Sequence, residues 1–206
     1  MVDVEKREIR PHQLSPSAWN RYETCPRMYW LSRQRLPRKA GMAASLGTAV
    51  HASIEDLLNM SLDGRVDDEA GWLPLAAEGF LKDRWEEEKA VFLATPRRPD
   101  WKESKWNEAK KQQKGGIILL LDHINARELP HERITVALWK HLQSLAIAVE
   151  GELVTSDARL MGRLDLLFAE LDEKGAMKGW LVADLKTGNA PTKELKTEVN
   201  RQLRMY

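Results

Sequence analysis

The amino-acid sequence predicts an α/β fold in which helices pack against a central sheet. Apolar residues recur at helical spacing over most of the chain up to Leu142. Three short runs rich in leucine and β-branched residues then occupy 147–156, 160–171 and 178–187, separated by turn residues. A last helical pattern over 192–206 closes the chain. The order of helices, three strands in a meander and a helix favours an α/β sandwich with helices packed on a central sheet.

Length and composition indicate one soluble globular domain. The chain has 206 residues, of which 43% are hydrophobic and 31% charged, with 32 basic against 31 acidic side chains. This balance does not indicate a nucleic-acid partner, so any basic surface must be local. The single cysteine, Cys25, excludes an internal disulfide. No apolar stretch approaches the about 20 residues of a membrane span, and the N-terminus is too charged for a signal peptide, so we expect a cytoplasmic protein without a membrane partner.

Turn and capping residues divide the helical part of the sequence. Ser15 is the expected N-cap of a first helix with Pro16 at its first position, and Pro26 ends that helix and begins the next. A third helix is predicted over 46–61. The region 73–142 is predicted to be a helical lobe. The third helix is predicted to have one apolar face, formed by Leu46, Val50, Ile54, Leu57 and Leu58. Within the lobe, breaks between helices are predicted at 95–100, Gly115-Gly116 and Pro130.

Charged residues occur where the predicted strands should be apolar. Asp184 and Lys186 are two residues apart at the end of the third run, so their side chains share one face of a strand. A divalent cation beside the carboxylate would compensate for its desolvation, and an ordinary ion pair at a strand edge is the alternative. Asp165 interrupts the second run between leucines, where the alternative is an edge position.

Further polar residues lie beside apolar stripes. His51 is next to the stripe of the third helix, with Glu55 one turn later, and the pair could also be an ordinary helix pair. Glu150 and Glu152 alternate out of the first strand, as a solvated face also would. The final helix has one stripe formed by Leu195, Val199, Gln202 and Tyr206, whose polar half is also compatible with a simple amphipathic helix.

Five short segments, in this order, resemble the PD-(D/E)XK nuclease superfamily, and within it the branch of RecB-type nuclease domains and CRISPR-associated exonucleases. They are LSPSAWNRYETCPRMYWL, GTAVHASIE, GRLD, VADLKTG and QLRMY, which together span residues 14–206. The resemblance implies a restriction-endonuclease-like core with a central mixed sheet, flanking helices and a helical insertion lobe. It implies a single domain over 1–206, with the N-terminal helices and histidine motif in 14–62, the lobe in 73–142, and the catalytic sheet and last helix in 146–206.

The resemblance also implies roles for individual residues. His51, Asp165 and Asp184 would be metal ligands, helped by the backbone carbonyl of Leu185, and Lys186 would position or activate the attacking water. Gln202 and Tyr206 would support the active site and the nucleic-acid backbone. Glu150 resembles a glutamate that often precedes the first acidic motif.

Oxygen ligands with one imidazole suit Mg²⁺ or Mn²⁺ as the cofactor. Some members of this branch hold an iron-sulfur cluster, with one cysteine at the position of Cys25 and three after the last helix. A single cysteine cannot supply those thiolates, so we expect no cluster in this chain. A chain that ends inside a motif helix is also expected to be a C-terminally truncated fragment.

The lobe contains aromatic and basic residues in the segment 101–114. Aromatic stacking on bases beside phosphate-binding lysines is a way to hold single strands, whereas the interleaved glutamates favour a solvated helix face with core tryptophans. The candidate nucleic-acid contacts are Trp101, Lys102, Lys105, Trp106 and Lys110.

Two functions are compatible with the sequence. The first is a metal-dependent deoxyribonuclease, an exonuclease of RecB-like type in DNA repair, recombination or CRISPR adaptation, acting on single strands or duplex ends. A helicase or a CRISPR-adaptation protein is its candidate partner. The second is a catalytically inactive nucleic-acid-binding module of a helicase-nuclease assembly. The set of His51, Asp165, Asp184 and Lys186 favours the first.

Overall fold

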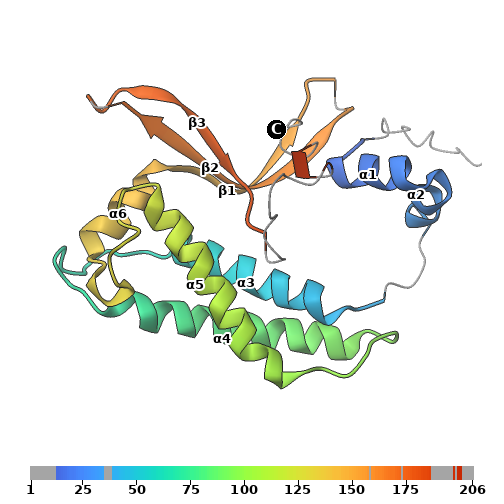
Figure 1. Cartoon of the computed structure of the whole chain (residues 1–206), viewed down its shortest axis with the longest axis horizontal. Coiled ribbons are helices and arrows are strands. Elements are labelled where there is room, and N and C mark those ends of the chain that lie inside the picture. Colours follow the sequence, from blue (N-terminus) through green and yellow to red (C-terminus); the bar gives the residue numbers. More distant parts are fainter. Residues whose placement is uncertain are drawn as a thin grey trace, which may run out of the picture. The chain divides into compact units, whose positions relative to one another are not determined.

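Helices precede a sheet in the computed structural model of the chain, which describes residues 13–34, 39–157, 159–172, 174–186, 197 and 199–200 (Figure 1). The helices are α1 (Pro16–Thr24), α2 (Pro26–Ser32), α3 (Met42–Asn59), α4 (Trp72–Ala94), α5 (Trp106–Asp122) and α6 (Val136–Leu145), with 3₁₀ turns η1 (Glu103–Lys105) and η2 (His131–Arg133). The strands are β1 (Ala146–Val154), β2 (Met161–Leu171) and β3 (Met177–Ala183), in the spatial order β1-β2-β3. This antiparallel meander with helices confirms the predicted fold class.

The chain divides into two compact units. The first takes its described residues from Met1–Leu36, Gly151–Leu164 and Pro191–Tyr206, and the second takes them from Pro37–Glu150 and Asp165–Ala190.

Within the first unit, α1 and α2 begin where the sequence predicts. The hydroxyl oxygen of Ser15 accepts a hydrogen bond from the backbone N–H of Ala18 at 3.2 Å, and Pro16 follows in the first turn of α1. Cys25 is extended between the two helices, and α2 begins at Pro26. Both proline positions are therefore confirmed as helix starts.

The core of the second unit forms where α3 packs against α4 and α5 (Figure 1). Trp139 of α6 is fully buried, and its indole N–H donates to the carbonyl of Leu57 at 3.0 Å. The predicted apolar face of the third helix is confirmed, since its five members are all at most 4% exposed: Leu46, Val50, Ile54, Leu57 and Leu58. The helix itself begins at Met42, four residues before the predicted start.

The predicted break at Gly115-Gly116 is wrong, because α5 continues through both glycines. A glycine inside a helix lowers the stability of the helix by about 1 kcal/mol relative to alanine, so two consecutive glycines usually indicate the end of a helix. Packing overrides that cost: Gly116 is buried, and a Cβ built on it would lie 2.6 Å from Cδ1 of Ile54 on α3. The interruptions predicted at 95–100 and Pro130 are confirmed, because both lie between helices.

One buried polar network joins the three central helices. The side-chain amide of Gln113 on α5 donates to the hydroxyl of Ser53 on α3 at 3.0 Å and to the carbonyl of Ala77 on α4 at 2.8 Å. The Ser53 hydroxyl in turn donates to the carbonyl of Val50 at 2.8 Å. Ser53 is 0% exposed and Gln113 is 4% exposed. Because buried polar groups require partners, this network fixes the rotation of α3 against its neighbours.

The sheet packs on these helices through alternate residues of β2. Leu166 and Phe168 are 2% and 1% exposed and belong to the helical core, opposite Ala183 and Leu181 of β3 in the antiparallel register. Strand β3 ends at Ala183, before the predicted end of the third run, and two residues later the backbone N–H of Leu185 donates to the side chain of Asp165 instead of to a backbone carbonyl.

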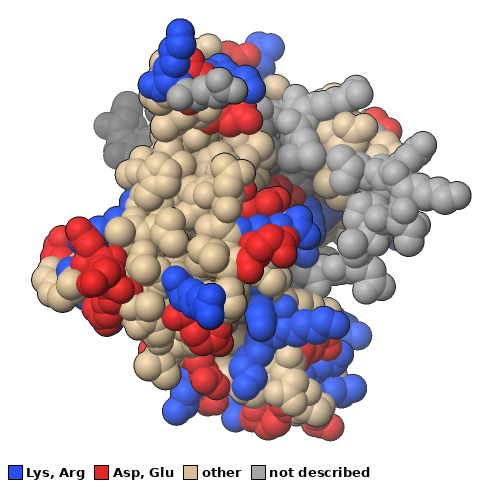
Figure 2. All heavy atoms as spheres, turned by 60° about the vertical axis from the view of Figure 1, so that its left-hand side comes forward, with Lys and Arg blue, Asp and Glu red and all other residues tan. Residues whose placement is uncertain are grey.

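None of the helices in the described residues is long and apolar enough to cross a membrane. On the face shown in Figure 2, basic and acidic side chains are interspersed, in agreement with the balanced charge of the sequence.

Ser53→Ala is expected to lower the free energy of unfolding by roughly 1–3 kcal/mol, because it leaves one buried amide hydrogen of Gln113 without its acceptor. Thr48→Ala is the matched control, since the exposed Thr48 hydroxyl also donates to its own helix, at 3.1 Å to the carbonyl of Ala44, and within the described part of the chain it accepts no bond from another helix. Urea unfolding of both variants measures the difference. Equal effects of the two substitutions would contradict a role for the network.

Candidate metal centre

Asp165 is an acidic residue inside a buried strand. It lies in β2 one residue before Leu166, and its side chain is 16% exposed. The carboxylate oxygen Oδ2 accepts a hydrogen bond from the backbone N–H of Leu185 at 2.7 Å. The same oxygen lies 3.5 Å from Nδ1 of His51. His51 and Asp165, two of the three side chains that are predicted to share an ion with Asp184, therefore lie close together, and the shared ion site stays a prediction.

His51 reaches Asp165 because of its position on α3. Its neighbours Val50 and Ile54 are buried in the core, which turns the flank of the helix that bears His51 toward β2. The His51 side chain is 24% exposed, so the imidazole is partly accessible to solvent.

Glu150 completes a group of three candidate ligands. One ligand atom from each of His51, Glu150 and Asp165 lies within 4.8 Å of the others. Glu150 has a backbone φ of 55°, a conformation that non-glycine residues adopt rarely and at a cost of about 1–3 kcal/mol. Such strain persists where the surrounding structure determines it, and strained residues are concentrated at functional sites. The strained backbone is a structural reason to include Glu150, which the sequence indicated through the alternation of the first strand and through the resemblance.

The carboxylates of this cluster repel one another, which affects the pKa of Asp165. Burial raises the pKa of the Asp165 carboxyl, and the carboxylates of Asp184 and Glu150 raise it further, against the opposing influence of His51 and the Leu185 hydrogen bond. A bound cation would remove this penalty. One imidazole and carboxylate oxygens form a donor set that suits Mn²⁺ and Mg²⁺, so the residues present fit a divalent ion.

Asp184 and Lys186 lie directly after β3. The Asp184 side chain is 5% exposed, the Lys186 side chain is 49% exposed, and the Lys186 ammonium pairs with Oδ2 of Asp184. Between them, Leu185 packs against the helical core. The two charges therefore form the ion pair that was the alternative for this spacing, and the carboxylate of Asp184 is also close enough to Asp165 to raise the pKa of Asp165.

The structure brings together part of the predicted set and adds to it. His51 and Asp165 meet Glu150, whereas Asp184 meets Lys186. For Leu185 the observed contact uses the backbone N–H, and the expected role of its carbonyl stays a prediction. Gln202 and Tyr206 lie outside the described residues. Of the predicted last helix, the described residues Thr197, Val199 and Asn200 have helical backbone.

The tryptophans of the lobe pack against each other. Trp85 contacts Trp101 and Trp106 edge-on, with ring centroids 4.8 Å and 5.5 Å away. Both rings also pack against the hydrophobic core. The tryptophans are therefore packed in the core, which is the alternative that the interleaved glutamates favour. Stacking of nucleic-acid bases on these rings stays a prediction.

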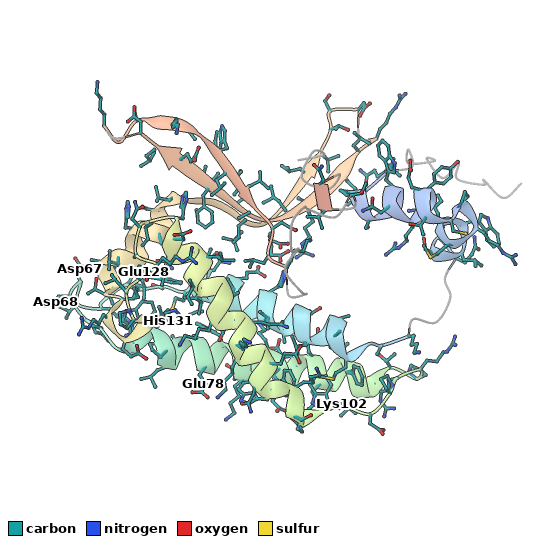
Figure 3. The ribbon with its side chains drawn as sticks, in the orientation of Figure 1. Asp67, Asp68, Glu78, Lys102, Glu128 and His131 are labelled. Carbon is teal, nitrogen blue, oxygen red and sulfur yellow. The ribbon has the colours of Figure 1, made fainter. Side chains whose placement is uncertain are left out.

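The lobe lysines have acidic neighbours. Lys105 pairs with Glu108, and the ammonium of Lys110 lies 3.6 Å from Glu78 and 5.9 Å from the ring centroid of Trp106. Lys102 is exposed and lies near the start of α5, away from β2 and β3 (Figure 3). The lobe residues therefore do not belong to the group around Asp165.

The family model of the PD-(D/E)XK nuclease superfamily matches residues 13–206. The chain therefore belongs to the PD-(D/E)XK nuclease superfamily. Searches of curated proteins and of solved structures give no match.

Asp165→Asn is expected to stabilise the metal-free protein at neutral pH. Because the pKa of Asp165 is raised in the folded state, the folded state binds the proton more tightly and ionisation of this group opposes folding. The penalty is absent below the unfolded pKa of about 3.9 and complete above the raised folded pKa. The difference in free energy of unfolding, variant minus wild type, should increase as the pH rises from about 4 through the raised folded pKa.

Urea unfolding in EDTA at several pH values measures this difference. A difference that stays flat or falls as the pH rises would show that the Asp165 charge is not destabilising.

Proposed function

We propose that the chain is a divalent-metal-dependent nuclease that hydrolyses DNA phosphodiester bonds. The observation that carries the proposal is the convergence of His51, Glu150 and Asp165 within 4.8 Å in a chain of the PD-(D/E)XK nuclease superfamily. The adjacent pair of Asp184 and Lys186 adds the acid and the cation of the motif that gives the superfamily its name.

His51, Glu150 and Asp165 would hold the divalent ion, with Asp184 and the Leu185 carbonyl as further ligands. A bound Mg²⁺ or Mn²⁺ lowers the pKa of a coordinated water and offsets the charge that develops on the phosphate. The raised pKa of Asp165 supports this assignment, because burial and then the neighbouring carboxylates disfavour its charged form, a cost that a cation offsets.

Lys186 would act on the phosphate and the attacking water. Its ammonium is anchored on the nearly buried Asp184 carboxylate, while about half of its side chain surface faces solvent. A lysine held in this way places a positive charge at the edge of the site, where it can interact with a phosphate group whatever the base sequence of the DNA. Gln202 and Tyr206 would support the site and the nucleic-acid backbone, as the resemblance implies.

The order of the five motifs supports an exonuclease of RecB-like type that acts on single strands or duplex ends in DNA repair, recombination or CRISPR adaptation. A helicase or CRISPR-adaptation protein would deliver the substrate, and the cytoplasm is the compartment we propose. The lobe residues Trp101, Lys102, Lys105, Trp106 and Lys110 are the proposed secondary contacts with DNA.

Lys186→Met is expected to lower cleavage of a labelled DNA strand by about 10²–10³-fold while Mn²⁺ still binds, because the oxygen and nitrogen ligands remain. The control is Lys178→Met, which removes an exposed lysine from β3 and should cut at the wild-type rate. Cleavage in Mg²⁺ and in Mn²⁺ is measured on single-stranded and duplex DNA, and Mn²⁺ binding is measured by calorimetry.

Cleavage by Lys186→Met at the wild-type rate would refute the role of this lysine. A wild-type protein that binds DNA and never cuts it with either ion would instead favour a noncatalytic nucleic-acid-binding module.

A further inference from the structure

Gly116 occupies an unusual place in the second unit. It lies in the middle of α5 and is buried, whereas the preceding Gly115 is exposed and has no described atom within 4 Å of a Cβ built on it. A glycine in a helix interior disfavours the helix, so the two neighbours share the same backbone penalty and differ only in what surrounds them.

Two other elements lie close to the position where a Gly116 side chain would be. A Cβ at this position would lie 2.6 Å from Cδ1 and 3.9 Å from Cγ1 of Ile54 on α3. It would also lie 3.9 Å from Cδ2 of Leu185, in the segment after β3. A Cβ would therefore overlap the end of the Ile54 side chain and only touch Leu185, so the absence of a side chain sets how closely α5 approaches α3, and a side chain longer than a methyl group would also press on Leu185.

Ile54 and Leu185, the two residues next to Gly116 in space, are each close to a residue of the candidate metal centre. Ile54 is three residues after His51 on α3, and residues with this spacing are neighbours on a helix surface. Leu185 donates its backbone N–H to Oδ2 of Asp165 at 2.7 Å, and this oxygen lies 3.5 Å from Nδ1 of His51. A side chain at position 116 that shifts the backbone at Ile54 would therefore move the histidine side of the pair, and one that shifts the backbone at Leu185 would move the aspartate side.

We infer that Gly116 is a positioning residue of the metal centre, because its missing side chain sets the separation between His51 and Asp165 through Ile54 and Leu185. The predicted effect on metal affinity rests on the proposed nuclease function. The predicted effect on the Leu185 hydrogen bond does not, since that bond forms between residues of the metal-free chain.

The test compares Gly116→Val with Gly115→Val, which introduces the same β-branched side chain into the same helix at the open position. Gly116→Val is expected to weaken Mn²⁺ binding by at least about tenfold, whereas Gly115→Val changes it by no more than about twofold. Calorimetric titration of the full chain with Mn²⁺ measures both, and circular dichroism under the same conditions confirms that each variant is folded.

The double variant Gly116→Val with Ile54→Ala separates crowding from general damage. It adds three carbon atoms at position 116 and removes three at position 54, so the core volume is conserved. It is expected to bind Mn²⁺ within about threefold of Ile54→Ala alone. Gly116→Ala extends the series if Gly116→Val does not fold, and it should weaken Mn²⁺ binding more than Gly115→Ala.

A second readout requires no metal. In EDTA, hydrogen exchange of the Leu185 amide, followed by NMR, should be at least about tenfold faster in Gly116→Val than in Gly115→Val, because the bond to Asp165 is weakened. Equal exchange in the two variants would overturn the inference. Wild-type Mn²⁺ affinity in Gly116→Val and Gly116→Ala would overturn it also.

If the wild-type chain itself fails to bind Mn²⁺, the proposed function fails, and the exchange of the Leu185 amide still decides the role of Gly116.

Discussion

The carboxylate of Asp165 is the group on which the candidate site depends. One of its oxygens accepts the N–H of Leu185 and also approaches Nδ1 of His51, so a single oxygen of a mostly buried side chain connects β2, the segment after β3 and α3. The bond to Leu185 takes this residue out of the sheet ladder, and Asp184 and Lys186 are placed on either side of it. The geometry of the motif after β3 thus follows from one hydrogen bond to an acidic residue in the neighbouring strand.

Such a site requires that α3 does not move. The polar network through Ser53 and Gln113 fixes the middle of this helix, and α6 fixes its end, where the side-chain amide of Gln143 donates to the carbonyls of Leu58 and Met60 at 2.9 Å each. Carbonyl groups at a helix end lack partners within the helix, so these bonds satisfy groups that would otherwise face the core. His51 therefore projects from a helix that is held along its length by both apolar packing and buried hydrogen bonds.

Local patterns predicted much of this arrangement and failed where tertiary contacts decide. The apolar stripe of α3, the start of α1 at Pro16 and the three strands follow from periodicity and capping, which are local properties. The interruption at Gly115-Gly116 was wrong because the close approach of α5 to Ile54 involves residues distant in sequence. Glu150 belongs to the ligand group and has a left-handed backbone conformation. The sequence could not predict this conformation, because the alternation of polar and apolar residues in a strand contains no information about it.

The metal-free centre is unfavourable in two independent ways. The Asp165 carboxylate is desolvated beside other carboxylates, and Glu150 holds a strained backbone conformation. Neither feature helps the chain to fold, so the stability that tolerates them must come from the helical core and its networks. A cation bound by these side chains would attract the Asp165 carboxylate and so remove the cost of its desolvation. It would also be bound by the Glu150 side chain, which the strained backbone of that residue holds in the ligand group. The same residues that make the unliganded fold less stable are therefore those that make it suited to bind a divalent ion.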